Sequence, residues 1–257
     1  MTSLDETLSA LRLSGRKALV PYLVGGLDEH WLDHVRAAIH AGADAVEIGI
    51  PFSDPIMDGR TIQEASQRAL DLGATPVGVM DAMATIDVPA PLVVMTYYNL
   101  VARMGHERCA THLQACGVDG AIVPDLPLDE LNGWGDAADA AGVETILLAA
   151  PTTPDDRLAQ ICERSHGFVY GVSLMGVTGE RDHLAAHAGE MGRRCKAVTD
   201  KPVLLGVGIS TPEQAAQAAA SADGVIVGSA LVRRLLDGGG PEEAATFVRA
   251  LRAALDA

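Results

Sequence analysis

Eight short apolar runs, each followed by a helix-like stretch, constrain the fold of this 257-residue chain more than any other feature. The runs are rich in β-branched residues and end in Gly, Pro or a polar residue, which is typical of buried strands. Near-continuous apolar strands that alternate with amphipathic helices predict a parallel sheet covered by helices, and eight such units predict a closed barrel. The runs span residues 18–25, 43–50, 91–99, 120–126, 144–151, 167–174, 202–208 and 224–230.

The helical stretches agree with this interpretation. An open, doubly wound sheet is the alternative, but no Gly-x-Gly-x-x-Gly motif follows the first run. We therefore expect residues 1–257 to form a single α/β domain, a (β/α)8 TIM barrel with an extra N-terminal helix. The helical stretches span residues 4–13, 29–41, 61–72, 76–86, 105–116, 129–141, 155–164, 184–198, 212–221 and 242–255.

Two connections are longer than the others. Two candidate helices, 61–72 and 76–86, lie between the second and third runs, and a long segment, 175–187, follows the sixth. Loops that follow strands form the active face of such a barrel. The insertions after strands 2 and 6 therefore indicate where a functional site lies.

Charge and composition exclude several kinds of partner. The chain has 19 basic and 34 acidic residues, a net charge of −15, which argues against nucleic acid or an anionic membrane surface. No apolar run approaches the ~18 residues of a membrane span, and Asp5 and Glu6 lie where a signal peptide carries positive charge. The four cysteines form no Cys-x-x-Cys pair, which fits a reducing compartment. We expect a cytoplasmic protein.

Glu47 is the first candidate catalytic residue. Alternation along 43–50 places Val46 and Ile48 on the face that meets the helices, so that Glu47 points into the barrel. A carboxylate there loses hydration, which raises its pKa and suits acid–base chemistry. A buried Arg or Lys partner would make the glutamate structural, but none occurs inside the predicted strands.

The loop 51–60 places a second carboxylate above the same strand. It contains Asp54 before Pro55 and Asp58 before Gly59, and either aspartate could equally stabilise a turn. Two carboxylates on a strand end and its loop can nonetheless hold different protonation states. This arrangement makes Asp58, eleven residues after Glu47, the second candidate.

Glycine-bearing turns follow the last three predicted strands, at 176–179, 206–210 and 228–229. Each could be an ordinary strand–helix connection, but phosphate sites in these barrels form after strands seven and eight. Glycine lets the backbone approach an anion, and the N–H groups that open a short helix at Ser229 can bind it. Such a site needs no Lys or Arg and is compatible with the acidic composition.

The aromatic residues and the histidine pairs are each candidates for a binding site, the first for a planar ligand and the second for a metal. Five of the nine aromatic side chains lie at or just past predicted strand ends, where they could hold a planar apolar ligand or simply pack the rim. The pairs His30/His34 and His183/His187 have metal-ligand spacing, but neither includes the Glu of a His-Glu-x-x-His motif. We expect solvated histidines and no metal. The five aromatics are Tyr22, Phe52, Tyr97, Tyr98 and Tyr170.

Several sequence blocks together resemble the tryptophan synthase α subunit family. The likeness runs from about Val20 to the C-terminal helix and includes the blocks 42–47, 51–55, 58–59 and 124–127 and the late glycine turns. It implies retro-aldol cleavage of indole-3-glycerol phosphate to indole and glyceraldehyde 3-phosphate, a carbon–carbon lyase reaction of tryptophan biosynthesis. It also implies that this subunit has no cofactor.

The resemblance implies a role for individual residues. Glu47 occupies the position of the acid–base glutamate, and Asp58 that of the aspartate that accepts the indole N–H. Tyr170 matches a tyrosine near that glutamate, and Thr178 matches a threonine of a mobile lid. Gly179, Gly208, Gly228 and Ser229 match phosphate-binding positions, and the rim aromatics Tyr22 and Tyr97 complete the expected substrate site.

The resemblance also implies a partner, a pyridoxal phosphate-dependent β subunit in an α2β2-type complex that the loop 51–60 contacts. Here the sequence departs from the family pattern: Met57 stands where a small residue is usual, Arg60 where Pro is usual, and Leu27-Asp28 where Asp-Pro is usual. Two alternatives therefore stay open. The chain could be a free-standing lyase that releases indole, or a weakly catalytic phosphate-binding barrel that acts as an allosteric subunit.

Overall fold

The eight strands of the computed structural model close into one barrel in chain order, and each strand is parallel to both neighbours. The structure describes residues 3–172, 181–206 and 208–257. The predicted (β/α)8 barrel is confirmed. The strands are β1 (Ala18–Val24), β2 (Val46–Gly49), β3 (Leu92–Met95), β4 (Gly120–Ile122), β5 (Glu144–Ala149), β6 (Val169–Val172), β7 (Val203–Gly206) and β8 (Gly224–Val227).

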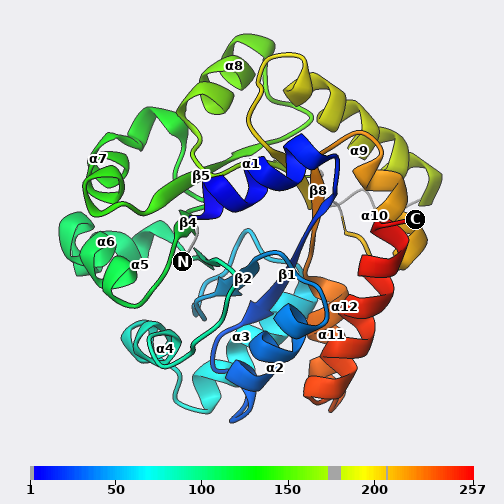
Figure 1. Ribbon diagram of the computed structural model, residues 1–257. Helices are drawn as coiled ribbons and strands as arrows, with labels where there is room; N and C mark the ends of the chain where they lie inside the picture. The colour runs from blue at the N-terminus through cyan, green and yellow to red at the C-terminus, as the bar shows by residue number, and fades with distance from the viewer. Residues whose placement is uncertain (1–2, 173–180, 207) are drawn as a thin grey trace.

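Helices surround this barrel, as Figure 1 shows. Two of them, α3 and α4, follow β2, and a short 3-10 helix (Leu128–Glu130) precedes α7. The helices of the ring are α2 (Trp31–His40), α3 (Arg60–Asp71), α4 (Pro76–Met83), α5 (Tyr98–Met104), α6 (His106–Ala115), α7 (Asn132–Ala141), α8 (Asp155–Arg164), α9 (Arg181–Lys196), α10 (Pro212–Ala219), α11 (Ser229–Leu236) and α12 (Pro241–Leu255).

Alternation of side chains along the strands divides the core into two layers. Val46 and Ile48 pack in the layer between strands and helices, whereas Ala45 belongs to a smaller cluster inside the barrel. The period-2 alternation that places successive side chains on opposite faces of a strand produces this division. It also places Glu47, between Val46 and Ile48, on the inner face.

Helix α1 (Leu4–Ser14) lies across one end of the barrel (Figure 1). Its start is fixed by a capping box, in which Ser3 and Glu6 bond each other's backbone N–H groups. Leu4 and Leu8 are fully buried in the cluster inside the barrel, and Leu4 approaches Gly120 at the beginning of β4. The strand N-termini are therefore covered, which leaves the C-terminal end for a site.

Arg252 of α12 joins the end of the chain to its first strands. Its Nη1 donates to the Lys17 carbonyl at 2.8 Å and to Asp44 Oδ2 at 3.1 Å, and Asp44 also accepts the Leu19 N–H. The Arg252 side chain is only 8% exposed. A buried guanidinium is tolerated here because each partner is a carbonyl or a carboxylate.

Three sequence-based expectations were wrong in detail. The run 91–99 is strand only to Met95, because the Tyr98 N–H is held by Asp125 Oδ1 and begins α5. The segment 175–187 is not loop throughout, since α9 begins at Arg181, although residues 173–180 lie outside the described part. His34 is buried rather than solvated, and its Nε2 lies 3.0 Å from Asp28 Oδ2.

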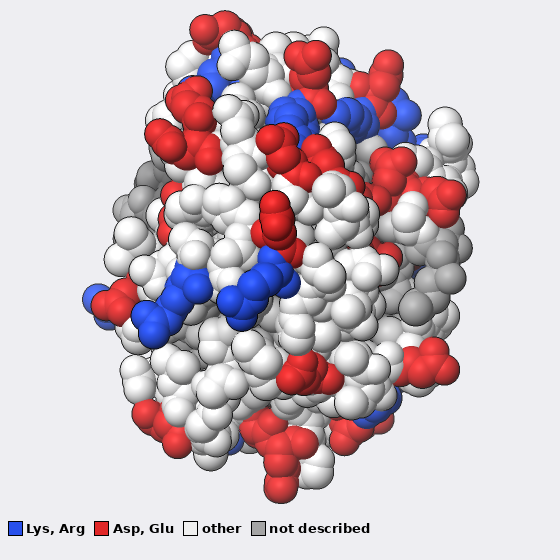
Figure 2. All heavy atoms as spheres, turned by 90° about the vertical axis from the view of Figure 1, so that its left-hand side faces the viewer, with Lys and Arg blue, Asp and Glu red and all other residues white. Residues whose placement is uncertain are grey.

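The surface in Figure 2 carries scattered carboxylates, and its basic side chains form small groups, some of them beside acidic ones. This distribution agrees with the excess of acidic residues in the composition. Of the helices described, none combines the length and the apolar character needed to cross a membrane. The four cysteines are buried free thiols.

Glu144, at the start of β5, should make stability depend on pH. Its Oε1 accepts the Asp5 N–H, but burial and nearby acidic groups raise its pKa to about 7. The raised pKa favours the neutral form in the native state, so its contribution to stability is full below about pH 4.5 and is lost as pH rises toward 7. E144Q should therefore raise the free energy of unfolding at pH 8 by on the order of 1 kcal/mol, after discounting for solvent screening, and should raise Tm with it.

Thermal unfolding of E144Q and of the parent chain between pH 4.5 and 8 tests this. The matched control is E130Q, because Glu130 is exposed. A Tm difference that does not grow with pH would contradict the prediction.

Candidate active site

Glu47 lies on β2 inside the barrel and is 1% exposed. Neither carboxyl oxygen has a hydrogen-bond partner among the described residues. Burial, and secondarily the charge of Asp58, raises the pKa of Glu47 to about 8. A carboxyl group in these surroundings holds its proton at neutral pH and can act as an acid.

Asp58 lies in the loop between β2 and α3. Burial raises its pKa, a hydrogen bond from the Tyr97 hydroxyl lowers it, and the result is about 6. That hydrogen bond, to Asp58 Oδ2, is 3.1 Å long. At neutral pH the two carboxyl groups of this barrel mouth thus differ, with Glu47 mainly protonated and Asp58 mainly ionised.

Tyr97, two residues after the end of β3, fixes the conformation of this loop. Its hydroxyl accepts the Met57 N–H at 3.0 Å while it donates to Asp58. The ring of Phe52 stacks on the ring of Tyr97, with centroids 5.0 Å apart and an interplanar angle of 27°. The sequence indicated Tyr97 only as a rim aromatic, because nothing local shows that a residue 39 positions away reaches Asp58.

Tyr22 of β1 and Tyr170 of β6 are buried and lie close enough to the two carboxyl groups to be affected by their charges. Tyr22 is the register partner of Glu47 on the neighbouring strand. Burial raises the pKa of both phenols well above 10, and the charges of Glu47 and Asp58 add to that shift. Both hydroxyls therefore stay protonated and can donate hydrogen bonds.

Two glycines at strand ends make room for these rings, a role that the sequence analysis assigned to neither of them. A Cβ atom on Gly49 would lie 2.0 Å from the Tyr22 hydroxyl, and one on Gly206 would lie 2.5 Å from the Tyr170 hydroxyl. Glycine inside a strand often marks such a close approach, so the signal was present in the sequence.

The expected phosphate-binding positions are only partly described. Gly208 has φ +74°, a left-handed conformation that favours glycine. Gly228 precedes α11, which begins at Ser229, and the first N–H groups of any helix point out of its N-terminus without an intrahelical acceptor. Gly228 also borders the Tyr22 side chain. Thr178 and Gly179 lie outside the described residues.

Comparison with known proteins identifies the family. Residues 8–255 match the family model described as tryptophan synthase alpha chain. A tryptophan synthase alpha chain of Streptomyces coelicolor is 45% identical, with 98% of this chain and 94% of the relative covered. That of Chloroflexus aggregans is 47% identical, with 91% and 90% covered.

This chain belongs to the tryptophan synthase alpha chain family. Solved structures agree with the assignment. A tryptophan synthase structure from Mycobacterium tuberculosis is 40% identical, has a TM-score of 0.90 and covers 98% of this chain and 97% of that chain. A tryptophan synthase subunit alpha from Legionella pneumophila is 31% identical, with a TM-score of 0.90 and 100% and 99% covered.

Membership fixes the reaction class. The chain is a carbon–carbon lyase of tryptophan biosynthesis, which cleaves indole-3-glycerol phosphate to indole and glyceraldehyde 3-phosphate. The expected family is thereby confirmed.

Removal of the Tyr97 hydroxyl should raise the pKa of Asp58. In Y97F the aspartate loses the hydrogen bond that stabilises its ionised form while it keeps its burial, so its pKa should rise by about 0.5–1 unit above the value near 6. Carboxyl carbon NMR during a pH titration measures this directly. Y98F is the matched control, because the Tyr98 hydroxyl contacts His106 instead. An equal pKa of Asp58 in Y97F and Y98F would refute the coupling.

Proposed function

We propose that Glu47 and Asp58 carry out the cleavage of indole-3-glycerol phosphate, Glu47 as the acid–base group and Asp58 as the ionised partner of the indole nitrogen. The observation that carries the proposal is their difference in protonation, with pKa values of about 8 and about 6 in one barrel mouth. Acid–base catalysis near pH 7 needs one carboxyl that holds a proton and one that has lost it.

Glu47 first gives its proton to the indole ring carbon that bears the glycerol phosphate chain. The positive charge that develops on the ring nitrogen is stabilised by the Asp58 carboxylate, which accepts the N–H. Glu47, now ionised, takes the proton from the hydroxyl on the adjacent side-chain carbon. The bond between that carbon and the ring breaks, its electron pair returns to the ring, and the side chain leaves as the aldehyde. Glu47 ends protonated, as it began.

The surrounding residues position the substrate. The rings of Tyr22, Tyr97 and Tyr170 hold the planar indole, and the backbone of Gly208, Gly228 and Ser229 holds the phosphate, together with Thr178 and Gly179. A helix N-terminus can bind the anion without a basic side chain. Binding the phosphate away from the reacting carbon lets that binding energy orient the ring against Glu47.

We further propose that the loop 51–60 docks on a β subunit that carries pyridoxal phosphate, and that this chain needs no cofactor and works in the cytoplasm. Support comes from two apolar side chains exposed in this loop, Ile56 at 77% and Met57 at 42%. Apolar side chains held in water are typical of an interaction surface. Met57 also links this surface to the site, because its N–H is held by Tyr97.

E47Q should abolish cleavage. Glutamine has nearly the same shape as glutamate but cannot donate an acidic proton, so we expect kcat to fall by at least about 10³-fold. Binding of a phosphorylated indole analogue should change less than about threefold, because Glu47 acts on the reacting carbon. Indole release and calorimetric titration with the analogue measure the two effects.

Two comparisons separate this outcome from a general loss of structure. G228V should weaken analogue binding, since a side chain there obstructs the approach of the anion to the backbone.

In the unaltered chain, kcat/KM should decline below about pH 6, where Asp58 gains a proton, and above about pH 8, where Glu47 loses one. Wild-type turnover by E47Q would exclude Glu47 from the reaction.

Addition of a tryptophan synthase β subunit should accelerate indole release at least about tenfold, if the loop 51–60 is the docking surface. I56D should remove that activation but not the basal rate, because a charge at an apolar contact opposes docking. V77D is the control, since Val77 is also an exposed apolar residue but lies on α4. Fast release without activation would favour the free-standing lyase, and no release in either assay would favour the weakly catalytic subunit.

A further inference from the structure

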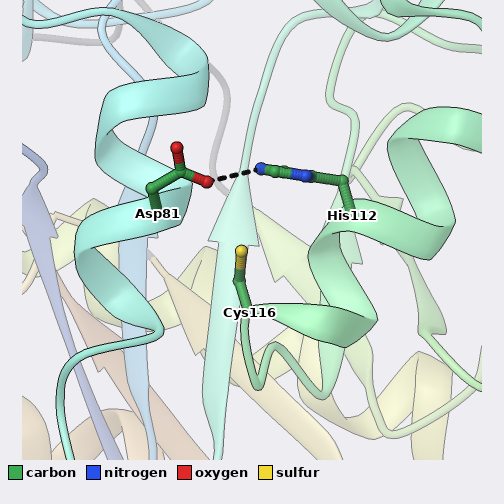
Figure 3. Close-up of side chains that lie close together, drawn as sticks. All are labelled: Asp81, His112 and Cys116. Carbon is green, nitrogen blue, oxygen red and sulfur yellow. Dashed lines mark ion pairs between the residues drawn. The ribbon is translucent and has the colours of Figure 1, made fainter.

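Three side chains that can bind a metal converge between α4 and α6, away from the site described above. Asp81 belongs to α4, His112 to α6, and Cys116 follows the end of α6 (Figure 3). One ligand atom from each lies within 4.8 Å of the others. His112 and Cys116 are four residues apart, the spacing that places two side chains on one face of a helix.

The imidazole nitrogen Nε2 of His112 has no hydrogen-bond partner among the described residues. His112 Nε2 is buried and lies 2.9 Å from Asp81 Oδ1, yet it makes no well-aligned hydrogen bond among the described residues. Cys116 is 5% exposed, whereas the Asp81 side chain is 59% exposed. Three donor atoms therefore surround one point that solvent can reach from the aspartate side.

We propose that Asp81, His112 and Cys116 form a binding site for a divalent, borderline-soft cation of the Zn²⁺ type. An imidazole nitrogen, a thiolate and a carboxylate oxygen are the ligands that Zn²⁺ takes, and a water molecule completes the tetrahedron in sites with three protein ligands. Hard cations such as Mg²⁺ prefer oxygen ligands alone.

Metal binding requires the ligand atoms, which lie within 4.8 Å of one another, to adjust to the spacing of a tetrahedron. Bond lengths of about 2.0–2.3 Å in a tetrahedron separate ligand atoms by roughly 3.3–3.7 Å. The 2.9 Å between His112 Nε2 and Asp81 Oδ1 must therefore widen by about half an ångström, which the exposed Asp81 side chain allows. The cation takes the place between these atoms and displaces the thiol proton of Cys116.

Protons compete with the metal at this site. Burial and the Asp81 charge raise the pKa of Cys116, so the thiolate is disfavoured until a cation compensates it. Zn²⁺ binds cysteine as the thiolate, so binding should release the thiol proton.

The position in the fold predicts a stabilising effect. Helices of a βα unit run antiparallel to the strands, so Cys116, after the C-terminus of α6, lies toward the end of the barrel that α1 covers. Active sites of these barrels lie at the opposite end. A cation here joins α4 to α6 and leaves the catalytic loops unchanged.

Calorimetric titration of the chelator-treated full chain with Zn²⁺ tests the proposal. We expect one Zn²⁺ per chain and, at about a hundredfold excess over Kd, a rise in Tm of roughly 5 °C. Loss of a residue that only orients a ligand already weakens metal binding about 10–100-fold. C116S and D81N, which alter ligands, should each weaken it at least tenfold, with kcat unchanged. C109S is the matched control, another buried cysteine of α6 outside the cluster.

Co²⁺ supplies a second readout, because a thiolate ligand gives a sulfur-to-metal charge-transfer absorption that nitrogen and oxygen ligands lack. The band should appear in the parent chain and C109S and be absent in C116S. Equal Zn²⁺ affinity in C116S, C109S and the parent would overturn the proposal, as would absence of the band. The trio would then be an Asp–His ion pair beside a buried thiol.

Discussion

The carboxyl group of Glu47 in the barrel interior, which has no hydrogen-bond partner within the described part of the chain, is the constraint on which this end of the barrel depends. Burial of such a group without a partner costs free energy unless it stays protonated. A closed, parallel barrel can hold it there because its strand ladder has no free edge through which the interior could relax or admit water. The fold thus maintains the protonation state that the role proposed for Glu47 needs.

The pKa of the second carboxyl group, that of Asp58, depends on a residue outside the strand that carries Glu47. Asp58 lies on a loop, and one hydroxyl, that of Tyr97, both lowers its pKa and holds the neighbouring backbone at Met57. Since Met57 and Ile56 are also the apolar side chains exposed on that loop, a partner that moves them would act on Asp58 through Tyr97. The loop therefore offers a short physical path from the proposed docking surface to the carboxylate proposed to stabilise the indole nitrogen.

Much of this architecture was predictable from local pattern. The period of two along residues 43–50 was enough to direct Glu47 inward, and the alternation of runs and helices was enough to predict the barrel. Contacts that a residue makes outside its own helix or strand were not predictable. His34 looked solvated because its partner Asp28 lies outside the helix pattern, and His112 and Cys116 escaped notice because their third neighbour, Asp81, belongs to another helix. Gly49 and Gly206 were predictable only in part. The sequence places both glycines inside strands, but it does not show which tyrosine rings fill the space beside them.

The bonds of Arg252 to Asp44 and to the Lys17 carbonyl have a consequence for how the protein is made. A ribosome makes Arg252 long after Lys17 and Asp44, and β8, which pairs with β1, after all the other strands of the barrel. The first strand therefore keeps one edge uncovered while the seven other strands are made. Nascent chains of this protein are accordingly exposed to aggregation and to chaperones until β8 has been made, and loss of the Arg252 side chain should harm folding in the cell more than its few lost contacts suggest.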